Sequence, residues 1–307
     1  MTEFKVDPLL LANTHEKYPP FLTCSLENYF VKRFLEEKKY LEYKHVYFLP
    51  VHWTVLSNKC YMYHLDQPHA QAVKKMFAEL PPKKKYYIIC QYANGIKFPY
   101  PKKTHNFEIH GGHAADLPLP LIYEDDGYLE NQPKKSFKEK KWLCSFVGAD
   151  QERGNRKDIC DYMDSYDDVT IHIHKWTGNI KKPMQQNFID ITSDSKFCLA
   201  PRGWGKSSFR FFEAWKLGSI PVYVWTEDIW LPYKEIIDYS KFSIIIHLNE
   251  VDKLHDILLN IDEKKYNNMF CEYNKIKHLF TLDGFYTYFC DLMKREDEKY
   301  EKNLKKN

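Results

Sequence analysis

Residues 196–224, KFCLAPRGWGKSSFRFFEAWKLGSIPVYV, predict a strand, a glycine-containing loop, a helix and a second strand in succession. Gly203 and Gly205 allow the loop backbone to approach a ligand closely. Ser207 or Ser208 can cap the helix that follows, and the first amides of that helix then face an anion. The stretch therefore predicts an α/β fold with a phosphate-binding loop.

This loop partly matches a nucleoside-triphosphate P-loop. Gly205, Lys206 and Ser207 form the end of the pattern G-x-x-x-x-G-K-[ST]. The position of the first glycine is Ala200, and Pro201 follows it with a fixed φ and no amide hydrogen for a phosphate. The mismatch disfavours a P-loop kinase or NTPase, which stays open as an alternative.

A longer motif runs through the same stretch and beyond it. Its parts are F-C-L at 197–199, P-R-G at 201–203, S-x-R-x-x-E-A at 208–214 and G-x-I-P-V at 218–222, with F-V-G at 146–148, G-N-R at 154–156, L-P-Y at 231–233 and I-D-Y-S-K-F at 237–242. Together they resemble the nucleotide-sugar-binding motif of the exostosin-like glycosyltransferases. The resemblance covers residues 142–259 and is faint over the amino-terminal half.

The resemblance implies a GT-B architecture, in which two Rossmann-like domains face each other across a cleft. We expect an acceptor-binding domain at residues 1–133, a nucleotide-sugar-binding domain at 141–285, and a C-terminal helix with a charged tail at 286–307. Residues 131–140, NQPKKSFKEK, are polar and charged and contain proline, which is typical of a linker.

Hydrophobic periodicity independently predicts alternating strands and helices, an α/β pattern. In such sheets ligands bind beyond the carboxyl ends of the strands. The predicted strands are 45–51, 86–91, 142–147, 169–173, 196–199, 221–224 and 242–246, and the predicted helices are 28–39, 69–80, 156–164, 208–217 and 283–302.

Composition excludes several other classes of protein. The chain has 45 basic and 42 acidic residues, a formal charge of +3, which gives no case for a nucleic-acid partner. Its eight cysteines contain no C-x-x-C pair and are typical of reduced thiols. No membrane span or signal peptide is recognisable, so we expect a cytoplasmic enzyme similar to the short soluble viral members of the family.

The predicted donor site binds a nucleotide diphosphate sugar. Departure of the nucleotide builds negative charge on its β-phosphate, which Arg202 and Arg210 can stabilise. The family's matching arginine suggests that Arg156 serves the same phosphates. Glu213 can accept hydrogen bonds from both ribose hydroxyls, or it can form an i,i+3 ion pair with Arg210.

The predicted donor-binding residues share a place in or beside the glycine-containing loop. They are Arg156, Arg202, Gly203, Gly205, Ser207, Ser208, Arg210 and Glu213. Trp204 either stacks on the base or covers the loop, and the family usually carries an acidic residue near the donor, here Glu227 or Asp228.

The catalytic base is sought on the first domain, because an inverting transfer needs a carboxylate or imidazole opposite the leaving nucleotide. Residues 109–120, IHGGHAADLPLP, predict a loop from which His110, His113 and Asp116 project. Asp116 is the first candidate and His113 the second. Asp66, between His64 and His69, belongs to a weaker cluster.

We expect no metal and no other cofactor. His110, His113 and Asp116 lie at three-residue steps, but two glycines argue against a helix that would align them as ligands. His172 and His174 share a strand face without a suitable third ligand. The arginines supply the positive charge instead.

The resemblance thus implies an inverting glycosyltransferase that moves a sugar from a UDP-sugar to a hydroxyl of a glycan or glycoprotein. Family members use several UDP-sugars, UDP-xylose and other UDP-hexoses or UDP-pentoses among them, and the selecting residues are not readable here. Two alternatives remain, the P-loop enzyme and a non-catalytic carbohydrate-binding scaffold.

Overall fold

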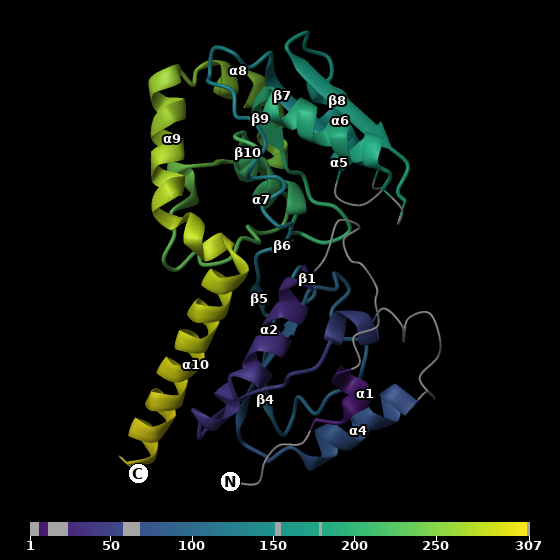
Figure 1. Ribbon diagram of the computed structural model, residues 1–307, viewed down its shortest axis with the longest axis vertical. Helices are drawn as coiled ribbons and strands as arrows, with labels where there is room; N and C mark the ends of the chain where they lie inside the picture. The colour runs from purple at the N-terminus through teal and green to yellow at the C-terminus, as the bar shows by residue number, and fades with distance from the viewer. Residues whose placement is uncertain (1–5, 12–23, 58–67, 151–154, 178–179, 306–307) are drawn as a thin grey trace. The chain divides into compact units, whose positions relative to one another are not determined.

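The computed structural model of the chain describes residues 6–11, 24–57, 68–150, 155–177 and 180–305 (Figure 1). The chain divides into two compact units, and the elements of each are described separately. The first unit includes Cys24–Leu119 and Thr281–Asn307, and the second includes Pro120–Phe280.

The first unit is built on a parallel sheet of four strands in the order β2-β3-β4-β5. Its core gathers aliphatic and aromatic side chains from the strands and from α4, including the fully buried Trp53, Tyr86 and Ile88. The elements are α1 (Pro8–Leu11), β1 (Cys24–Ser25), α2 (Leu26–Glu36), η1 (Lys39–Leu41), β2 (Val46–Phe48), α4 (Pro68–Glu79), β3 (Lys85–Cys90), β4 (Asn106–Gly111), β5 (Leu117–Pro118) and α10 (Leu282–Leu304).

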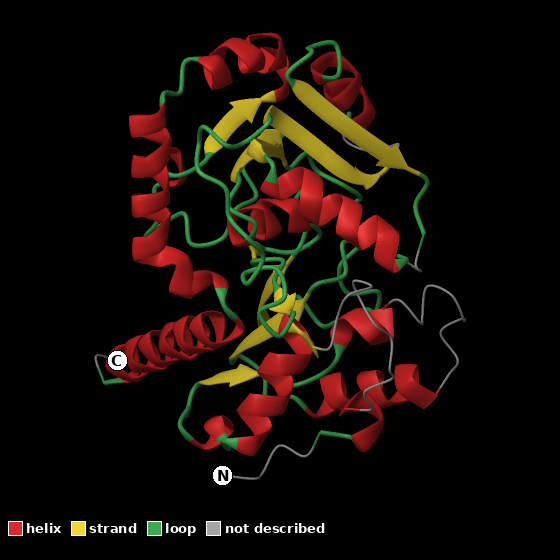
Figure 2. Ribbon diagram, turned by 45° about the horizontal axis from the view of Figure 1, so that its top comes forward, coloured by secondary structure: helices red, strands yellow, loops and turns green. Residues whose placement is uncertain are grey.

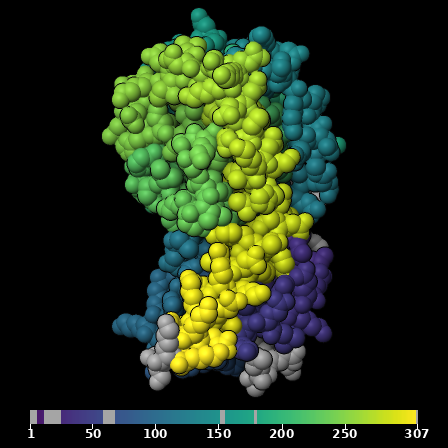
Figure 3. Space-filling model, turned by 90° about the vertical axis from the view of Figure 1, so that its left-hand side faces the viewer, coloured from purple at the N-terminus to yellow at the C-terminus, as the bar shows by residue number. Residues whose placement is uncertain are grey.

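The C-terminal helix α10 is part of the first unit. Figure 3 shows it in yellow along the surface beside the purple α2. Its Asp297 is buried, and one carboxylate oxygen accepts hydrogen bonds from the amides of Lys44, His45 and Val46 at 3.0, 2.6 and 3.0 Å. The helix predicted at 283–302 is therefore present, but it does not form a separate third part at 286–307.

The second unit contains a parallel sheet of five strands in the order β11-β10-β9-β7-β8, with helices packed against it (Figure 2). This order is that of a doubly wound sheet whose winding reverses between β7 and β9. The elements are β6 (Tyr123–Glu124), β7 (Trp142–Ala149), α5 (Arg156–Met163), β8 (Val169–His174), α6 (Lys182–Ser193), β9 (Ser195–Leu199), α7 (Phe209–Lys216), β10 (Ile220–Trp225), η2 (Tyr239–Lys241), β11 (Ile244–His247), η3 (Leu248–Lys253), α8 (Leu254–Leu259), α9 (Glu263–Ile276) and η4 (Lys277–Phe280).

The boundary between the units lies at Leu119 and Pro120, earlier than the predicted division at residues 133 and 141. Tyr123 and Leu129 pack in one apolar cluster with residues of the second unit. Residues of the predicted linker are also fastened to this unit, since the buried Lys140 donates to the carbonyl oxygen of Ser193 at 2.6 Å. The polar composition of residues 131–140 predicted a linker, but these contacts attach the segment to the second unit.

The predicted strands and helices of both halves are present with shifts of one to three residues at most of their ends. The prediction of an α/β fold with two Rossmann-like parts is confirmed, and their arrangement across a cleft stays a prediction. Helices α6 and α9 were not predicted from the sequence. No helix within the described residues is long and apolar enough to cross a membrane.

Candidate functional site

The candidate site lies where the winding of the second unit's sheet reverses. Strands β7 and β9 are neighbours there, and the segments that follow Ala149 and Leu199 leave the same edge of the sheet. Parallel doubly wound sheets bind ligands at this point, because adjacent connections run to opposite faces and open a crevice. The segment after β7 leads to Arg156, and the segment after β9 is the glycine-containing loop.

Arg156 joins these two segments. Its guanidinium donates to the carbonyl oxygens of Ala149 at 2.9 Å, Pro201 at 3.2 Å and Arg202 at 3.2 Å. The residue is 8% exposed, and burial, together with the neighbouring charge of Arg210, lowers the pKa of Arg156 to about 10. In the structure Arg156 holds the loop in place, while its contact with phosphate stays a prediction.

Gly203 leaves space for the guanidinium of Arg156. A Cβ atom at Gly203 would lie 2.8 Å from Nη2 of Arg156, closer than real Cβ contacts allow. The described glycines with positive φ do not include Gly203 or Gly205, so neither glycine serves a left-handed turn. Gly203 therefore makes room for the guanidinium that fixes the loop.

Arg210 and Glu213 form an ion pair on α7, which is the i,i+3 alternative considered for Glu213. Glu213 is 4% exposed, and its other carboxylate oxygen accepts a hydrogen bond from the hydroxyl of Tyr123 at 2.7 Å. Burial, with the carboxylate of Glu213 adding to it, raises the pKa of Tyr123 well above its usual range. Arg210 also donates from Nε to the carbonyl oxygen of Val147 at 2.8 Å. The binding of ribose by Glu213 stays a prediction.

Two buried donor atoms of the loop have no hydrogen-bond partner among the described residues. Ser208 occupies the N-cap position with extended φ and ψ, but its side chain makes no capping hydrogen bond. The hydroxyl of the buried Ser207 has no hydrogen-bond partner, and neither does Nε of Arg202. Buried polar groups are normally paired, so these donors suit an acceptor on a ligand.

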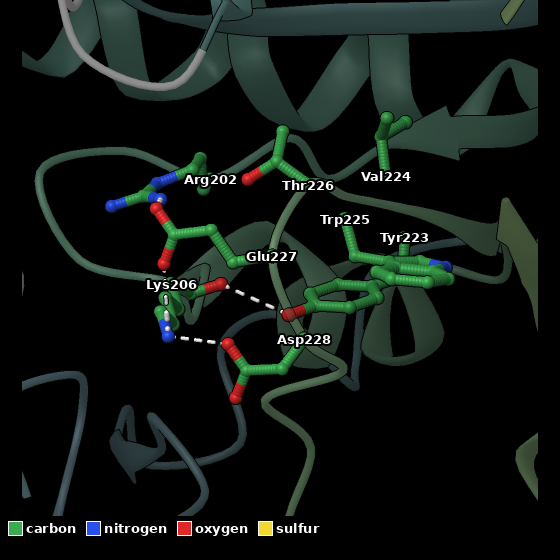
Figure 4. Close-up of a pocket in the computed structure, with 8 residues that line it drawn as sticks. All are labelled: Arg202, Lys206, Tyr223, Val224, Trp225, Thr226, Glu227 and Asp228. Carbon is green, nitrogen blue, oxygen red and sulfur yellow. Dashed lines mark hydrogen bonds and ion pairs between the residues drawn. The ribbon is translucent and has the colours of Figure 1, made fainter. Parts of the chain in front are cut away.

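Beside the loop lies a small, shallow pocket that is partly open to solvent (Figure 4). Its charged lining residues are Arg202, Lys206, Glu227 and Asp228. The carboxylate of Glu227 lies between the two cations, 3.5 Å from Arg202 and 3.0 Å from Lys206, and Asp228 contacts Lys206 from the other side. Sequence reasoning used Lys206 only to assess the P-loop pattern, although its place between Gly205 and Ser207 was the available signal.

Comparison with known proteins identifies the family. The Exostosin GT47 domain matches residues 52–261, more than half of the chain. The chain belongs to the exostosin GT47 family. Relatives include the Exostosin-1 homolog of Caenorhabditis elegans, 24% identical over 50% of this chain and 46% of the relative, and a probable glycosyltransferase of Arabidopsis thaliana, 30% identical over 32% and 21%. A probable glucuronosyltransferase of Oryza sativa subsp. japonica is 39% identical over 22% of this chain and 16% of the relative.

The chain thus aligns with less than half of the length of these curated relatives. Among solved structures, a TarM structure of S. aureus in complex with UDP and glycan ligands aligns with a TM-score of 0.39 and 12% identity. That alignment covers 68% of this chain and 55% of the TarM chain.

The predicted bases of this exostosin-family chain lie in the segment after β4 of the first unit. Asp116 is exposed, and its carboxylate accepts a hydrogen bond from the amide of Ile109 at 2.8 Å. His113 is half-buried in the same segment. His110 does not project from a loop as predicted, because strand β4 continues to Gly111.

His110 is instead buried in the sheet, where its Nε2 pairs with Glu108 at 3.0 Å and its ring packs on Phe289. The members of the weaker cluster at 64 and 66 lie outside the described residues. No group of three or more His, Cys, Asp or Glu in the described part of the chain could hold a metal ion. His172 contacts Asn187, and His174 contacts the carbonyl of Lys175.

The backbone at the start of the loop differs from a P-loop. The amide of Ala200 donates to the carbonyl oxygen of Val222 at 2.8 Å, so it belongs to the sheet. Pro201 has no amide hydrogen. A triphosphate cradle depends on successive amides of this segment, and here the first two are not available. The geometry disfavours the P-loop alternative.

Proposed function

We propose that this exostosin-family chain is an inverting glycosyltransferase that transfers a sugar from a UDP-sugar to a hydroxyl of a glycan or glycoprotein. The observation that carries the proposal is the set of buried donors at the sheet's reversal point, Arg202 Nε and Ser207 Oγ, beside the cation Lys206. Donors at this place fit the phosphates of a nucleotide.

The names of the rice relatives, probable glucuronosyltransferases, support a glucuronic acid donor, and UDP is the nucleotide that the family resemblance implies. UDP-glucuronic acid, UDP-xylose and other UDP-hexoses or UDP-pentoses are the donors to screen first. No metal or cofactor is needed in the proposed mechanism, because Arg202, Lys206 and the amides at the start of α7 can stabilise the leaving diphosphate.

In the proposed displacement, the acceptor hydroxyl attacks the anomeric carbon as the bond to the β-phosphate oxygen breaks. Asp116 takes the hydroxyl proton, with His113 as the second candidate, and the anomeric configuration inverts. The departing diphosphate gains the charge that the loop stabilises.

The test is calorimetric titration of the purified protein with UDP, and separately with ATP and Mg²⁺, each with and without EDTA. We expect UDP to bind equally in both conditions, and a screen of UDP-sugars then measures hydrolysis and transfer. Binding of ATP alone would refute the proposal in favour of the P-loop alternative. Binding of UDP that disappears with EDTA would refute metal independence, and binding of neither nucleotide would favour the scaffold.

A further inference from the structure

The pocket beside the loop holds its own anion. Glu227 follows β10 and places its carboxylate between the guanidinium of Arg202 and the ammonium of Lys206 (Figure 4). An oxygen anion bridging two cations is also the arrangement that a phosphate group adopts between basic residues. The carboxylate therefore marks a place where the structure already accommodates an anion.

A phosphate can replace Glu227 as the partner of the two cations, because the side chain of Glu227 is exposed and those of Arg202 and Lys206 are largely buried. The side chain of Glu227 is 64% exposed, whereas those of Arg202 and Lys206 are 12% and 18% exposed. Exposed ion pairs contribute little to stability, since solvent compensates for each contact that is lost. Glu227 can leave for solvent while the two cations stay in the pocket.

Asp228 plays a different part. It contacts Lys206 on the side away from Arg202 and holds the ammonium in the pocket. The hydroxyl of Tyr223, which donates to the carbonyl oxygen of Lys206 at 3.1 Å, fixes the backbone of the same residue. Burial lowers the pKa of Lys206, the carboxylates of Asp228 and Glu227 raise it, and the net direction is upward, so the side chain stays cationic at neutral pH.

We propose that Lys206 binds the diphosphate of the donor together with Arg202, and that Glu227 is an internal counter-anion which the diphosphate displaces on binding. This inference rests on the proposed function and extends it by assigning Lys206 and Glu227. Glu227 balances the charge of the two cations and weakens the binding of competing anions, so only a ligand with strong phosphate contacts replaces it.

The inference predicts that substitutions of Glu227 and Lys206, which contact each other, change the affinity for UDP in opposite directions. Glu227→Gln keeps the shape of the side chain and removes its charge, so UDP binds about 2- to 5-fold more tightly, the range expected for loss of an exposed ion pair. Lys206→Met removes a charged hydrogen-bond donor, so UDP binds about 10- to 100-fold more weakly. In the double variant, Glu227→Gln increases the affinity for UDP by a smaller factor, because Arg202 is then the only one of the two cations that Glu227 neutralises.

Calorimetric titrations with three probes separate this role from others. UDP and inorganic pyrophosphate carry the phosphates and should both show the changes, whereas uridine carries none and should show no change. The matched controls are Glu250→Gln and Lys253→Met, because Glu250 and Lys253 form an exposed ion pair at 3.3 Å elsewhere in the same unit. Thermal unfolding of each variant checks that it folds.

A weaker affinity of Glu227→Gln for UDP and uridine would overturn the inference, because Glu227 would then be a ligand of the nucleoside. Unchanged affinity of Glu227→Gln for UDP and pyrophosphate would also overturn it, while leaving the proposed function intact. If the unchanged protein binds pyrophosphate but not UDP, and Glu227→Gln binds it more tightly, the inference stands and the proposed UDP donor fails. If the unsubstituted protein binds neither UDP nor pyrophosphate, both the inference and the proposed function are overturned.

Discussion

The buried carboxylate of Glu27 should make the stability of the first unit depend on pH. Glu27 lies in the first turn of α2 and is 1% exposed. Its oxygens accept hydrogen bonds from the amide of Thr54 at 2.8 Å, the hydroxyl of Thr54 at 2.5 Å and the amide of Gln91 at 3.2 Å. One carboxylate therefore ties the start of α2 to two other segments of the unit.

Burial raises the pKa of Glu27 from 4.5 to about 7, although these hydrogen bonds lower it in part. The folded protein consequently holds this proton more tightly than the unfolded chain does. The stabilisation is fully present below the unfolded pKa and is lost as the pH rises through the folded pKa. Its size is about 3 kcal/mol of the free energy of unfolding, because each pKa unit corresponds to about 1.4 kcal/mol.

Hydrogen exchange of the amides in β3 (Lys85–Cys90) measures this free energy in the whole protein, at about pH 5 and about pH 8. Glu27→Gln resembles the protonated acid, so its free energy of unfolding should lose this dependence on pH. Between the two pH values, the free energy of unfolding of the unsubstituted protein should fall by about 3 kcal/mol relative to that of the variant. Glu36→Gln, an exposed site on the same helix, is the control and should keep the dependence. Equal pH dependence in the unchanged protein and in Glu27→Gln would refute the reasoning, as would a relative gain of stability with pH.

Three further changes test the site and the units. Gly203→Ala brings a Cβ atom to 2.8 Å from Arg156, so UDP binding should weaken in calorimetry with a smaller change in melting temperature; unaltered affinity would contradict the role of this glycine. Asp297→Ala leaves three amides without their acceptor and should lower the stability of the first unit by about 3 kcal/mol, measured by denaturant unfolding; the exposed Glu298→Ala is its control. Asp116→Asn should leave UDP affinity intact and remove sugar transfer, and surviving activity would transfer the role of base to another residue.

The second unit could be predicted from sequence because its signals are local. Strand β9 is an apolar run, and helix α7 carries an arginine and a carboxylate three residues apart. Each element follows from residues close together in the chain. The order of the strands and the reversal between β7 and β9 then place the loop at the edge where ligands bind.

Contacts between distant segments could not be predicted in this way. Tyr123 lies 90 residues before Glu213, and its hydroxyl donates a hydrogen bond to the buried carboxylate of Glu213. His110 lies in a segment whose glycines predicted a loop, yet pairing with β3 extends the strand through it. The polar segment before β7 was interpreted as a linker, because composition does not show that Lys140 finds a buried carbonyl acceptor.

The cations of the site differ in the free energy needed to break their present contacts, which a ligand must replace. Arg156 is buried on three backbone carbonyls, and the ion pair between Arg210 and Glu213 is largely buried. Breaking a buried pair costs about 3 to 5 kcal/mol, since it leaves an uncompensated charge, whereas an exposed pair costs about 1 kcal/mol or less. Arg202 and Lys206 share an exposed acid, so a phosphate can replace that acid cheaply. By this argument we expect Arg202 and Lys206 to contact the donor, while Arg156 holds the loop and Arg210 joins α7 to β7.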